Sequence, residues 1–202
     1  MLHYVTTNPG KLQEARQYLG EGTITDYDYD YTEIQRDSLE PIAAAGAREA
    51  YREVGEPVVV DDSGLFLDAF DGFPGPYSAY VEDTLGVETV WELARTVEDR
   101  GAAFRCVMAY CDGSAVGEPA APGKPEGSEA ADDNDGDDLP VRLFVGSVGG
   151  EIVAPRGDGG FGYDPIFEHD GRTFAERSSA EKNELSHRGR ALAAFAEWYD
   201  QR

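Results

Sequence analysis

The sequence is poor in positive charge. Seventeen Lys and Arg residues stand against 40 Asp and Glu residues, which gives a formal net charge of −23, and only three of the basic residues are lysines (Lys11, Lys124 and Lys182). Because duplex nucleic acid and anionic membranes bind basic surfaces, neither is expected as the main partner. Charge repulsion of this size destabilises a compact chain unless salt screens it. We therefore expect a protein that works in concentrated salt, as in a halophilic archaeon, with an ordinary acidic cytosolic enzyme as the alternative.

Cysteine and long apolar runs are also scarce. The two cysteines, Cys106 and Cys111, are separated by an odd number of positions in one apolar segment, so a strand would direct them to opposite faces, and we expect free thiols. No charged-then-apolar leader opens the sequence, and no apolar run approaches the roughly 20 residues of a membrane span. The sequence predicts a cytoplasmic protein without a membrane partner.

Apolar residues are frequent enough to build a core. They make up 41% of the 202 residues, so we expect residues 1–202 to form a single domain. Residues 112–140 differ, because Gly, Pro, Ala, Asp and Glu dominate them and large apolar side chains are almost absent; we expect a flexible acidic insertion loop. Its run 132–137 resembles half of a calcium loop, but Ala131 and Arg142 would replace the first and last ligands, so we reject a calcium site.

The spacing of apolar residues, with Gly, Pro and Ser where elements should begin or end, predicts alternating strands and helices. A helix should begin after Ser38 and stop at Gly55. The expected strands are 1–6, 23–32, 57–60, 102–111, 141–148 and 165–167. Three further helices are expected: one that follows residue 11, one at 84–100 and one that begins after Ser186.

Two adjacent carboxylates, Asp61 and Asp62, follow the apolar run 57–60 directly. At the carboxyl end of a sheet strand they would lie where α/β folds bind ligands. Neighbouring carboxylates on a strand point in different directions, so one can grip a metal while the other polarises water. The alternative is an acidic turn that caps a helix.

The segment Thr6-Thr7-Asn8-Pro9-Gly10-Lys11 joins the first strand to the first helix. Hydroxyl groups, an amide, a glycine, a helix N-terminus and a lysine are the elements that hold phosphate. The spacing differs from that of a Walker A loop. A simple strand-to-helix turn is the alternative.

The segment 157–165 is too rich in glycine to serve packing alone. It contains Phe161, Gly162, Tyr163 and Asp164, and aromatic faces stack on bases while a fixed carboxylate orients a base edge or a ribose. The alternative is an irregular turn.

Three cations cluster near the start of the last helix. Lys182, His187 and Arg188 lie where the helix dipole disfavours positive charge, which indicates another role. His187 and Arg188 can donate hydrogen bonds to an oxo group, and Lys182 can neutralise phosphate. A pairing of Arg188 with surface acids is the alternative.

Together these motifs resemble the inosine triphosphate pyrophosphatase family, also called the Ham1 or non-canonical purine NTP pyrophosphatase family. The resemblance runs nearly end to end, and it rests on the segments 6–11, 61–65, 73–78, 161–164 and 186–188.

The resemblance implies an α/β fold with a long mixed β-sheet, two lobes flanked by helices and a central nucleotide-binding cleft. It implies a homodimer that uses Mg²⁺ to hydrolyse ITP, dITP and XTP to the monophosphate and pyrophosphate, cleansing the nucleotide pool. Glu33 and Asp62 would be the metal ligands, with Asp62 also the proton acceptor. Thr6, Thr7, Asn8, Pro9, Gly10, Lys11, Ser63 and Lys182 would face the triphosphate or ribose, and Phe161, Gly162, Tyr163, Asp164, His187 and Arg188 would form the base pocket.

Two departures concern phosphate neutralisation. Many members of the family carry a lysine where this sequence has Gly46, with Arg48 the nearest basic residue, and Ala79 and Tyr80 occupy another position that is commonly basic. Two further hypotheses remain open: a Maf-like pyrophosphatase acting on other nucleotides, and a nucleotide- or ion-binding protein without turnover.

Overall fold

The computed structural model describes residues 1–20, 22–114 and 139–202. Most of the predicted acidic insertion, residues 115–138, lies outside the described residues. The sheet order is β2-β1-β3-β5-β6-β7-β8, with β4 paired to β3. The strands are β1 (Leu2–Val5), β2 (Ile24–Tyr27), β3 (Val58–Leu67), β4 (Pro74–Gly75), β5 (Gly101–Cys111), β6 (Arg142–Ile152), β7 (Phe167–His169) and β8 (Arg172–Thr173). The helices are α1 (Pro9–Leu19), α2 (Leu39–Val54), α3 (Ser78–Leu85), α4 (Val87–Ala94), α5 (Ser179–Leu185) and α6 (His187–Tyr199).

The sheet is mixed, as predicted. Strand β1 pairs in parallel with β2 and β3, whereas β4 runs antiparallel to β3, and β7 antiparallel to β6 and β8. The prediction of a mixed α/β fold with helices flanking an open sheet is therefore confirmed. None of the helices within the described ranges is long and apolar enough to cross a membrane.

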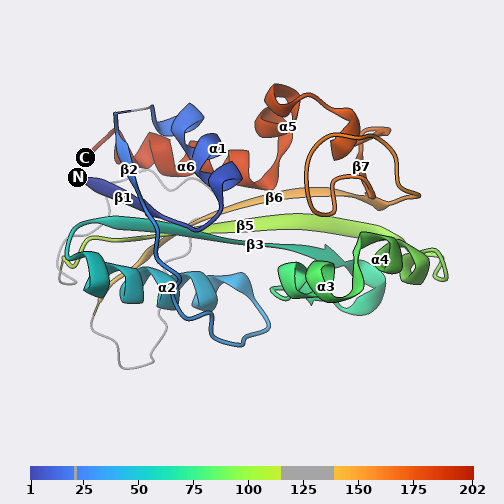
Figure 1. Ribbon diagram of the computed structural model, residues 1–202, viewed down its shortest axis with the longest axis horizontal. Helices are drawn as coiled ribbons and strands as arrows, with labels where there is room; N and C mark the ends of the chain where they lie inside the picture. The colour runs from blue at the N-terminus through green and yellow to red at the C-terminus, as the bar shows by residue number, and fades with distance from the viewer. Residues whose placement is uncertain (21, 115–138) are drawn as a thin grey trace. The chain divides into compact units, whose positions relative to one another are not determined.

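The chain forms two compact units. Unit 1 comprises residues 1–62, 107–145 and 191–202, and unit 2 comprises residues 63–106 and 146–190, so that β3, β5 and β6 contribute to both. In unit 1, α2 covers one face of the strands, and α1 and the C-terminal part of α6 cover the other (Figure 1). In unit 2, α3 and α4 lie on one side of the strands and α5 lies on the other (Figure 1).

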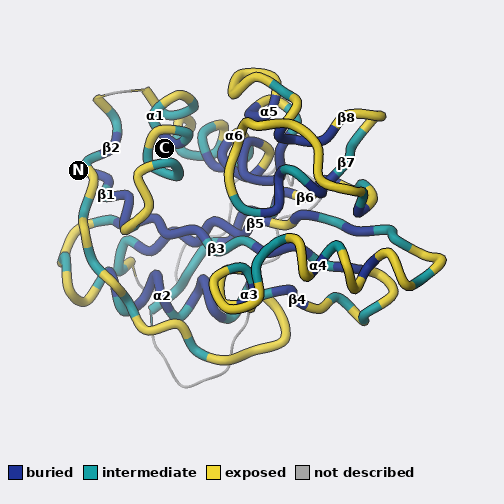
Figure 2. Tube along the Cα trace, turned by 45° about the vertical axis from the view of Figure 1, so that its right-hand side comes forward, coloured by how far each residue is buried: buried dark blue, intermediate teal, exposed yellow. Residues whose placement is uncertain are grey.

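Each unit has its own apolar interior. The strand backbones are mostly buried, whereas the outer sides of the helices are exposed (Figure 2). Unit 2 is built around an aromatic cluster in which Phe104 packs on Phe167 and Phe174, with ring centroids 4.6 and 6.0 Å away. In unit 1, Phe195 and Trp198 of α6 pack on Phe144 of β6. Cys106 and Cys111 are both buried free thiols, as predicted.

Several predicted boundaries are confirmed. Helix α2 starts after Ser38 and ends at Gly55, which adopts a left-handed conformation at φ 73°. Helix α6 follows Ser186, whose hydroxyl accepts a hydrogen bond from the Gly189 N–H at 3.0 Å. Strand β5 matches the predicted strand 102–111 within one residue.

Other predicted boundaries are wrong. The predicted helix 84–100 is two helices, because Gly86, at φ 80°, separates α3 from α4, and α4 ends at Ala94. Strand β2 ends at Tyr27, and residues 28–36 have no regular structure. The predicted strand 165–167 begins only at Phe167, after a series of turns, and β6 continues beyond the predicted end at Val148 to Ile152.

Candidate active site

Half of the predicted phosphate-binding segment, from Pro9 to Lys11, is the first turn of α1. Asn8 is the N-cap residue, and its Oδ1 accepts hydrogen bonds from the N–H groups of Gly10 at 2.9 Å and Lys11 at 3.3 Å. Pro9 occupies the first turn of the helix, where its lack of an N–H costs nothing. The Thr6 hydroxyl accepts from the Asn8 N–H at 3.1 Å. The connecting loop is thus shorter than predicted, and a helix N-terminus with its positive dipole lies at this position.

Lys11 is tied to the aspartate pair. Its Nζ donates to the backbone oxygen of Asp61 at 3.0 Å and lies 3.2 Å from the Asp61 carboxylate. The Tyr4 hydroxyl donates to the same carboxylate at 2.6 Å. Asp61 is only 2% exposed. A buried carboxylate needs such compensation, so Asp61 neutralises Lys11 inside unit 1.

Asp62 follows Asp61 in the middle of β3. The prediction that the two aspartates end a strand is wrong, because β3 continues through them to Leu67, with Leu65 and Leu67 buried. Successive side chains on a strand alternate between faces, and Asp62 is partly exposed where Asp61 is buried. Asp62 is therefore the carboxylate of the pair that solvent and ligands can reach.

Glu33 lies on the irregular segment 28–36 that leads from β2 into α2, and its side chain is exposed. Among the described residues, no three His, Cys, Asp or Glu side chains are grouped so that they could hold a metal ion by themselves. Mg²⁺ commonly takes one or two protein carboxylates, with phosphate oxygens and water completing its shell. Glu33 and Asp62 are hard oxygen donors, so their chemistry fits a magnesium ion that a bound triphosphate helps to hold.

The space at Gly46 on α2 is filled by Tyr31. A Cβ atom at position 46 would lie 2.5 Å from Cε2 of the tyrosine ring, which is too close for any real contact. Arg48, two residues further along, donates its Nε–H to the Leu139 carbonyl at 2.9 Å. An aromatic ring thus occupies the space beside the position where the resemblance led us to expect a lysine.

In unit 2, Asp164 and Lys182 form a buried ion pair. Their Oδ2 and Nζ atoms are 2.5 Å apart, and the residues are 3% and 7% exposed. The Phe161 N–H donates to the same carboxylate oxygen at 2.8 Å, and the Lys182 ammonium lies 4.0 Å from the centre of the Phe161 ring. Gly160, at φ 73°, passes so close to Asp164 that a Cβ would collide with its carboxylate. Three of the predicted site residues therefore meet around one carboxylate.

Tyr163 points into the core of unit 2. It is 3% exposed, and its hydroxyl donates to the Ser78 carbonyl at 2.8 Å. Burial raises the pKa of this phenol above its usual range, and the charges of Glu82 and Asp83 add to the shift. Of the four predicted residues 161–164, Phe161 is the most accessible, at 49% exposed. Phe161 is therefore the ring available to stack on a planar ligand.

His187 and Arg188 lie in the first turn of α6 and are nearly buried. The His187 ring stacks on Phe104 with a centroid distance of 4.7 Å and an interplanar angle of 12°. Arg188 is 4% exposed, and its Nη2 lies 3.4 Å from the Ser63 hydroxyl. The structure thus brings together Ser63 and Arg188, two predicted site residues that are far apart in sequence.

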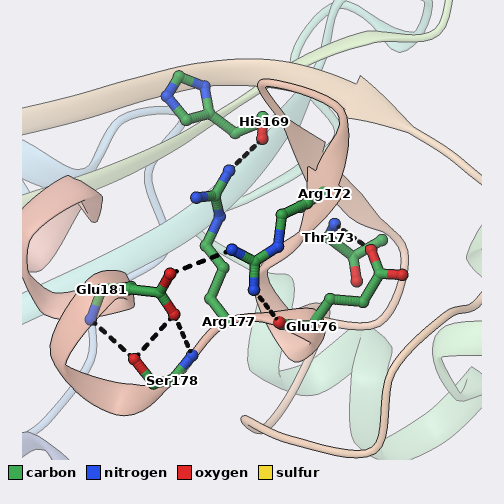
Figure 3. Close-up of polar contacts among 7 residues, drawn as sticks. All are labelled: His169, Arg172, Thr173, Glu176, Arg177, Ser178 and Glu181. Carbon is green, nitrogen blue, oxygen red and sulfur yellow. Dashed lines mark hydrogen bonds and ion pairs between the residues drawn. The ribbon is translucent and has the colours of Figure 1, made fainter.

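A polar network that the sequence motifs did not reveal fixes the start of α5 (Figure 3). Ser178 and Glu181 form a capping box, and Arg172 donates to the Glu181 carboxylate at 3.0 Å. Arg172 also bonds the Glu176 carbonyl, and Arg177 bonds the His169 carbonyl. Hydrogen bonds from the Ser178 backbone and hydroxyl and from Arg172 lower the pKa of Glu181 to about 2. Because Lys182 follows Glu181, this network also fixes the lysine that pairs with Asp164. Only the S-x-x-E spacing of the capping box could have indicated it.

The predicted site residues thus form separate groups within the two units. In unit 1, Lys11 contacts Asp61, the neighbour of Asp62, while Glu33 lies on the segment before α2. In unit 2, Phe161, Asp164 and Lys182 form one group, and Ser63 and Arg188 form another.

Known proteins resemble this chain over nearly its whole length. The model of the Ham1 family matches residues 2–198. A protein named dITP/XTP pyrophosphatase from Methanopyrus kandleri is 46% identical over 97% of this chain and 94% of its own. One of the same name from Thermococcus kodakarensis is 43% identical over 98% and 96%. The solved structure of a HAM1 protein from Coxiella burnetii superimposes with a TM-score of 0.79, at 30% identity and with full coverage of both chains. The chain therefore belongs to the Ham1 family.

Proposed function

We propose that this protein hydrolyses non-canonical purine nucleoside triphosphates (ITP, dITP and XTP) to the nucleoside monophosphate and pyrophosphate. The activity named for the relatives from Methanopyrus kandleri and Thermococcus kodakarensis supports this proposal. The main structural observation in its favour is the different environment of the two neighbouring aspartates. Asp61 is buried against Lys11 and Tyr4, whereas its neighbour Asp62 is partly exposed on the same strand.

Asp62 would accept a proton from the attacking water. The water oxygen attacks the α-phosphorus, the bond from that phosphorus to the β-phosphate oxygen breaks, and pyrophosphate leaves. Mg²⁺, when bound, would neutralise the triphosphate charge and polarise its oxygens. Glu33 and Asp62 would be its protein ligands. The segment from Thr6 to Lys11, at the N-terminus of α1, would bind phosphate through its hydroxyl groups and the positive end of the helix dipole.

Residues of unit 2 would recognise the base and sugar. The exposed ring of Phe161 offers a stacking surface, and the Asp164–Lys182 pair beneath it holds that ring in place. N–H groups of His187 and Arg188 would donate hydrogen bonds to the six-oxo oxygen of hypoxanthine or xanthine, whereas the six-amino group of adenine would leave these donors unpaired. Unpaired buried donors discriminate by orders of magnitude. Guanine shares the six-oxo group, so its exclusion must depend on the two-position.

The remaining expectations also come from the resemblance and the composition. We propose a cytoplasmic homodimer that removes deaminated nucleotides before polymerases use them. In unit 2, Phe73, Tyr77, Tyr80 and Leu85 expose apolar surface in and before α3, which offers area for a second copy of the chain. Light scattering coupled to size-exclusion chromatography, at molar KCl, would measure the mass of the assembly.

Product analysis tests the activity. The purified protein is incubated with ITP, XTP, ATP and GTP, with Mg²⁺, at low and at molar KCl. We expect pyrophosphate with IMP or XMP, and little product from ATP or GTP. Orthophosphate, indifference to the base, or no turnover at any salt concentration would overturn the proposal in favour of a Maf-like enzyme or a binding protein without turnover.

Asp62→Asn tests the proposed base. The amide cannot accept the proton, so we expect turnover to fall by at least about a hundredfold. Binding of a non-hydrolysable α,β-imido analogue of ITP should persist when measured by calorimetry. Asp68→Asn is a matched control on an exposed aspartate just beyond the same strand, and it should leave turnover unchanged. Full activity of Asp62→Asn would remove Asp62 from the mechanism.

A further inference from the structure

Glu33 lies on a segment that has no secondary structure of its own. Residues 28–36 form neither helix nor strand, yet a metal ligand must be held within a fraction of an ångström to be effective. The contacts that fix this segment therefore decide how well Glu33 can serve the proposed function. Those contacts converge on one face of α2.

Glu49 of α2 accepts hydrogen bonds from two residues that precede Glu33 in the chain. A single carboxylate oxygen, Oε1, accepts from the Tyr29 hydroxyl at 3.0 Å, the Thr32 N–H at 3.1 Å and the Thr32 hydroxyl at 3.4 Å. The hydrogen bond to Glu49 is the main reason that the pKa of Tyr29 is raised, so the phenol stays a donor. The backbone of Thr32, directly before Glu33, is thus held by α2.

Gly46 provides the second contact, one turn earlier on the same helix face. The ring of Tyr31 packs against the glycine so closely that a Cβ there would lie 2.5 and 2.7 Å from two ring carbons. Gly46 is buried within α2 at an ordinary helical φ, so no backbone requirement explains the glycine. The close approach of Tyr31 explains it.

We propose that Glu49 and Gly46 are positioning residues for Glu33. The Glu49 carboxylate and the space that Gly46 leaves for the Tyr31 ring hold residues 29–32 against α2. Glu33 follows these residues directly, so its carboxylate can bind metal without the cost of first ordering a loop. Pre-organisation of this kind lowers the entropic cost of binding, and outer contacts of metal ligands typically change metal affinity by about ten- to a hundredfold. This inference rests on the proposed role of Glu33.

The test compares Glu49→Ala with Glu53→Ala, a matched loss of an exposed carboxylate one turn further along α2. Binding of Mn²⁺ is followed by electron paramagnetic resonance in the presence of the α,β-imido analogue of ITP. Glu49→Ala should raise the Mn²⁺ dissociation constant about tenfold, and Glu53→Ala should leave it unchanged. At saturating Mg²⁺, kcat of Glu49→Ala should return to within about twofold of the wild type, because the contact acts through metal affinity.

A second pair of variants keeps the test decisive if Glu49→Ala folds poorly. Gly46→Ala should weaken Mn²⁺ binding by displacing the Tyr31 ring. In a Tyr31→Ala background, the same change should have no further effect, because the ring that it displaces is gone. Additive effects in this cycle, or Glu49→Ala behaving like Glu53→Ala, would overturn the inference.

Glu33→Gln separates this inference from the function on which it rests. If Glu33→Gln leaves Mn²⁺ affinity unchanged, the proposed ligand role of Glu33 fails and the inference fails with it. If Glu33→Gln weakens Mn²⁺ binding while Glu49→Ala does not, only the positioning role fails. Far-ultraviolet circular dichroism of each variant establishes that it is folded.

Discussion

At the scale of single residues, Lys11 and Asp61 depend on each other. The Asp61 side chain is fully buried and the Lys11 side chain is 21% exposed, so loss of Lys11 leaves a buried carboxylate without its counter-charge. We expect Lys11→Met to lower the free energy of unfolding by about 2–4 kcal/mol. The double variant Lys11→Met with Asp61→Asn should recover part of that loss. Urea titrations at constant KCl would measure both.

Arg95→Met provides the matched control. Arg95 pairs with Glu92 on the surface, and both side chains are more than half exposed. Its loss should cost less than about 1 kcal/mol. A similar cost for Lys11→Met and Arg95→Met would show that the interior pair contributes no more than a surface one.

At the scale of elements, the start of α5 should respond to acid. The pKa of Glu181 is lowered to about 2, below the usual value for glutamate, so its carboxylate stabilises the fold above the unfolded pKa of about 4.3. That contribution should fade as the pH falls from about 5 towards 2. The difference in unfolding free energy between wild type and Glu181→Gln should therefore shrink over this range.

The sequence predicted those elements whose ends carry local signals. Helix α2 was predicted from Ser38 and Gly55, and α6 from Ser186. The length of β3 was not predictable, because two consecutive aspartates read as a strand end until Lys11 and Tyr4 are seen to compensate Asp61. Those partners come from distant parts of the sequence.

The candidate site was predictable in its residue types but not in their pairings. The sequence singled out Lys11, Lys182 and Arg188 as cations for the substrate. The structure shows that Lys11 and Lys182 each already face a buried carboxylate, and that Arg188 lies near a hydroxyl. No sequence motif indicated the contacts of Glu49 with Tyr29 and Thr32, since a glutamate in the middle of a helix has many ordinary roles.

At the scale of the whole molecule, the net charge of −23 should make stability depend on salt. Screening of carboxylate repulsion should raise the melting temperature by about 10 °C or more between 0.1 and 2 M KCl. Differential scanning calorimetry would measure the shift. Sucrose at matched water activity is the control, because it is excluded from protein surfaces without screening charge. An equal shift in sucrose would show that solute exclusion, and not charge, is responsible.

Because both cysteines are buried, an added surface cysteine can be labelled selectively in this protein. Burial also raises the pKa of the Cys111 thiol, so neither native sulfur should react readily with maleimides while the chain is folded. A single cysteine placed at the exposed position 35 would then be the one reactive group. A fluorophore attached there lies in the same segment as Glu33. It would report whether binding of metal and nucleotide restricts the motion of that segment.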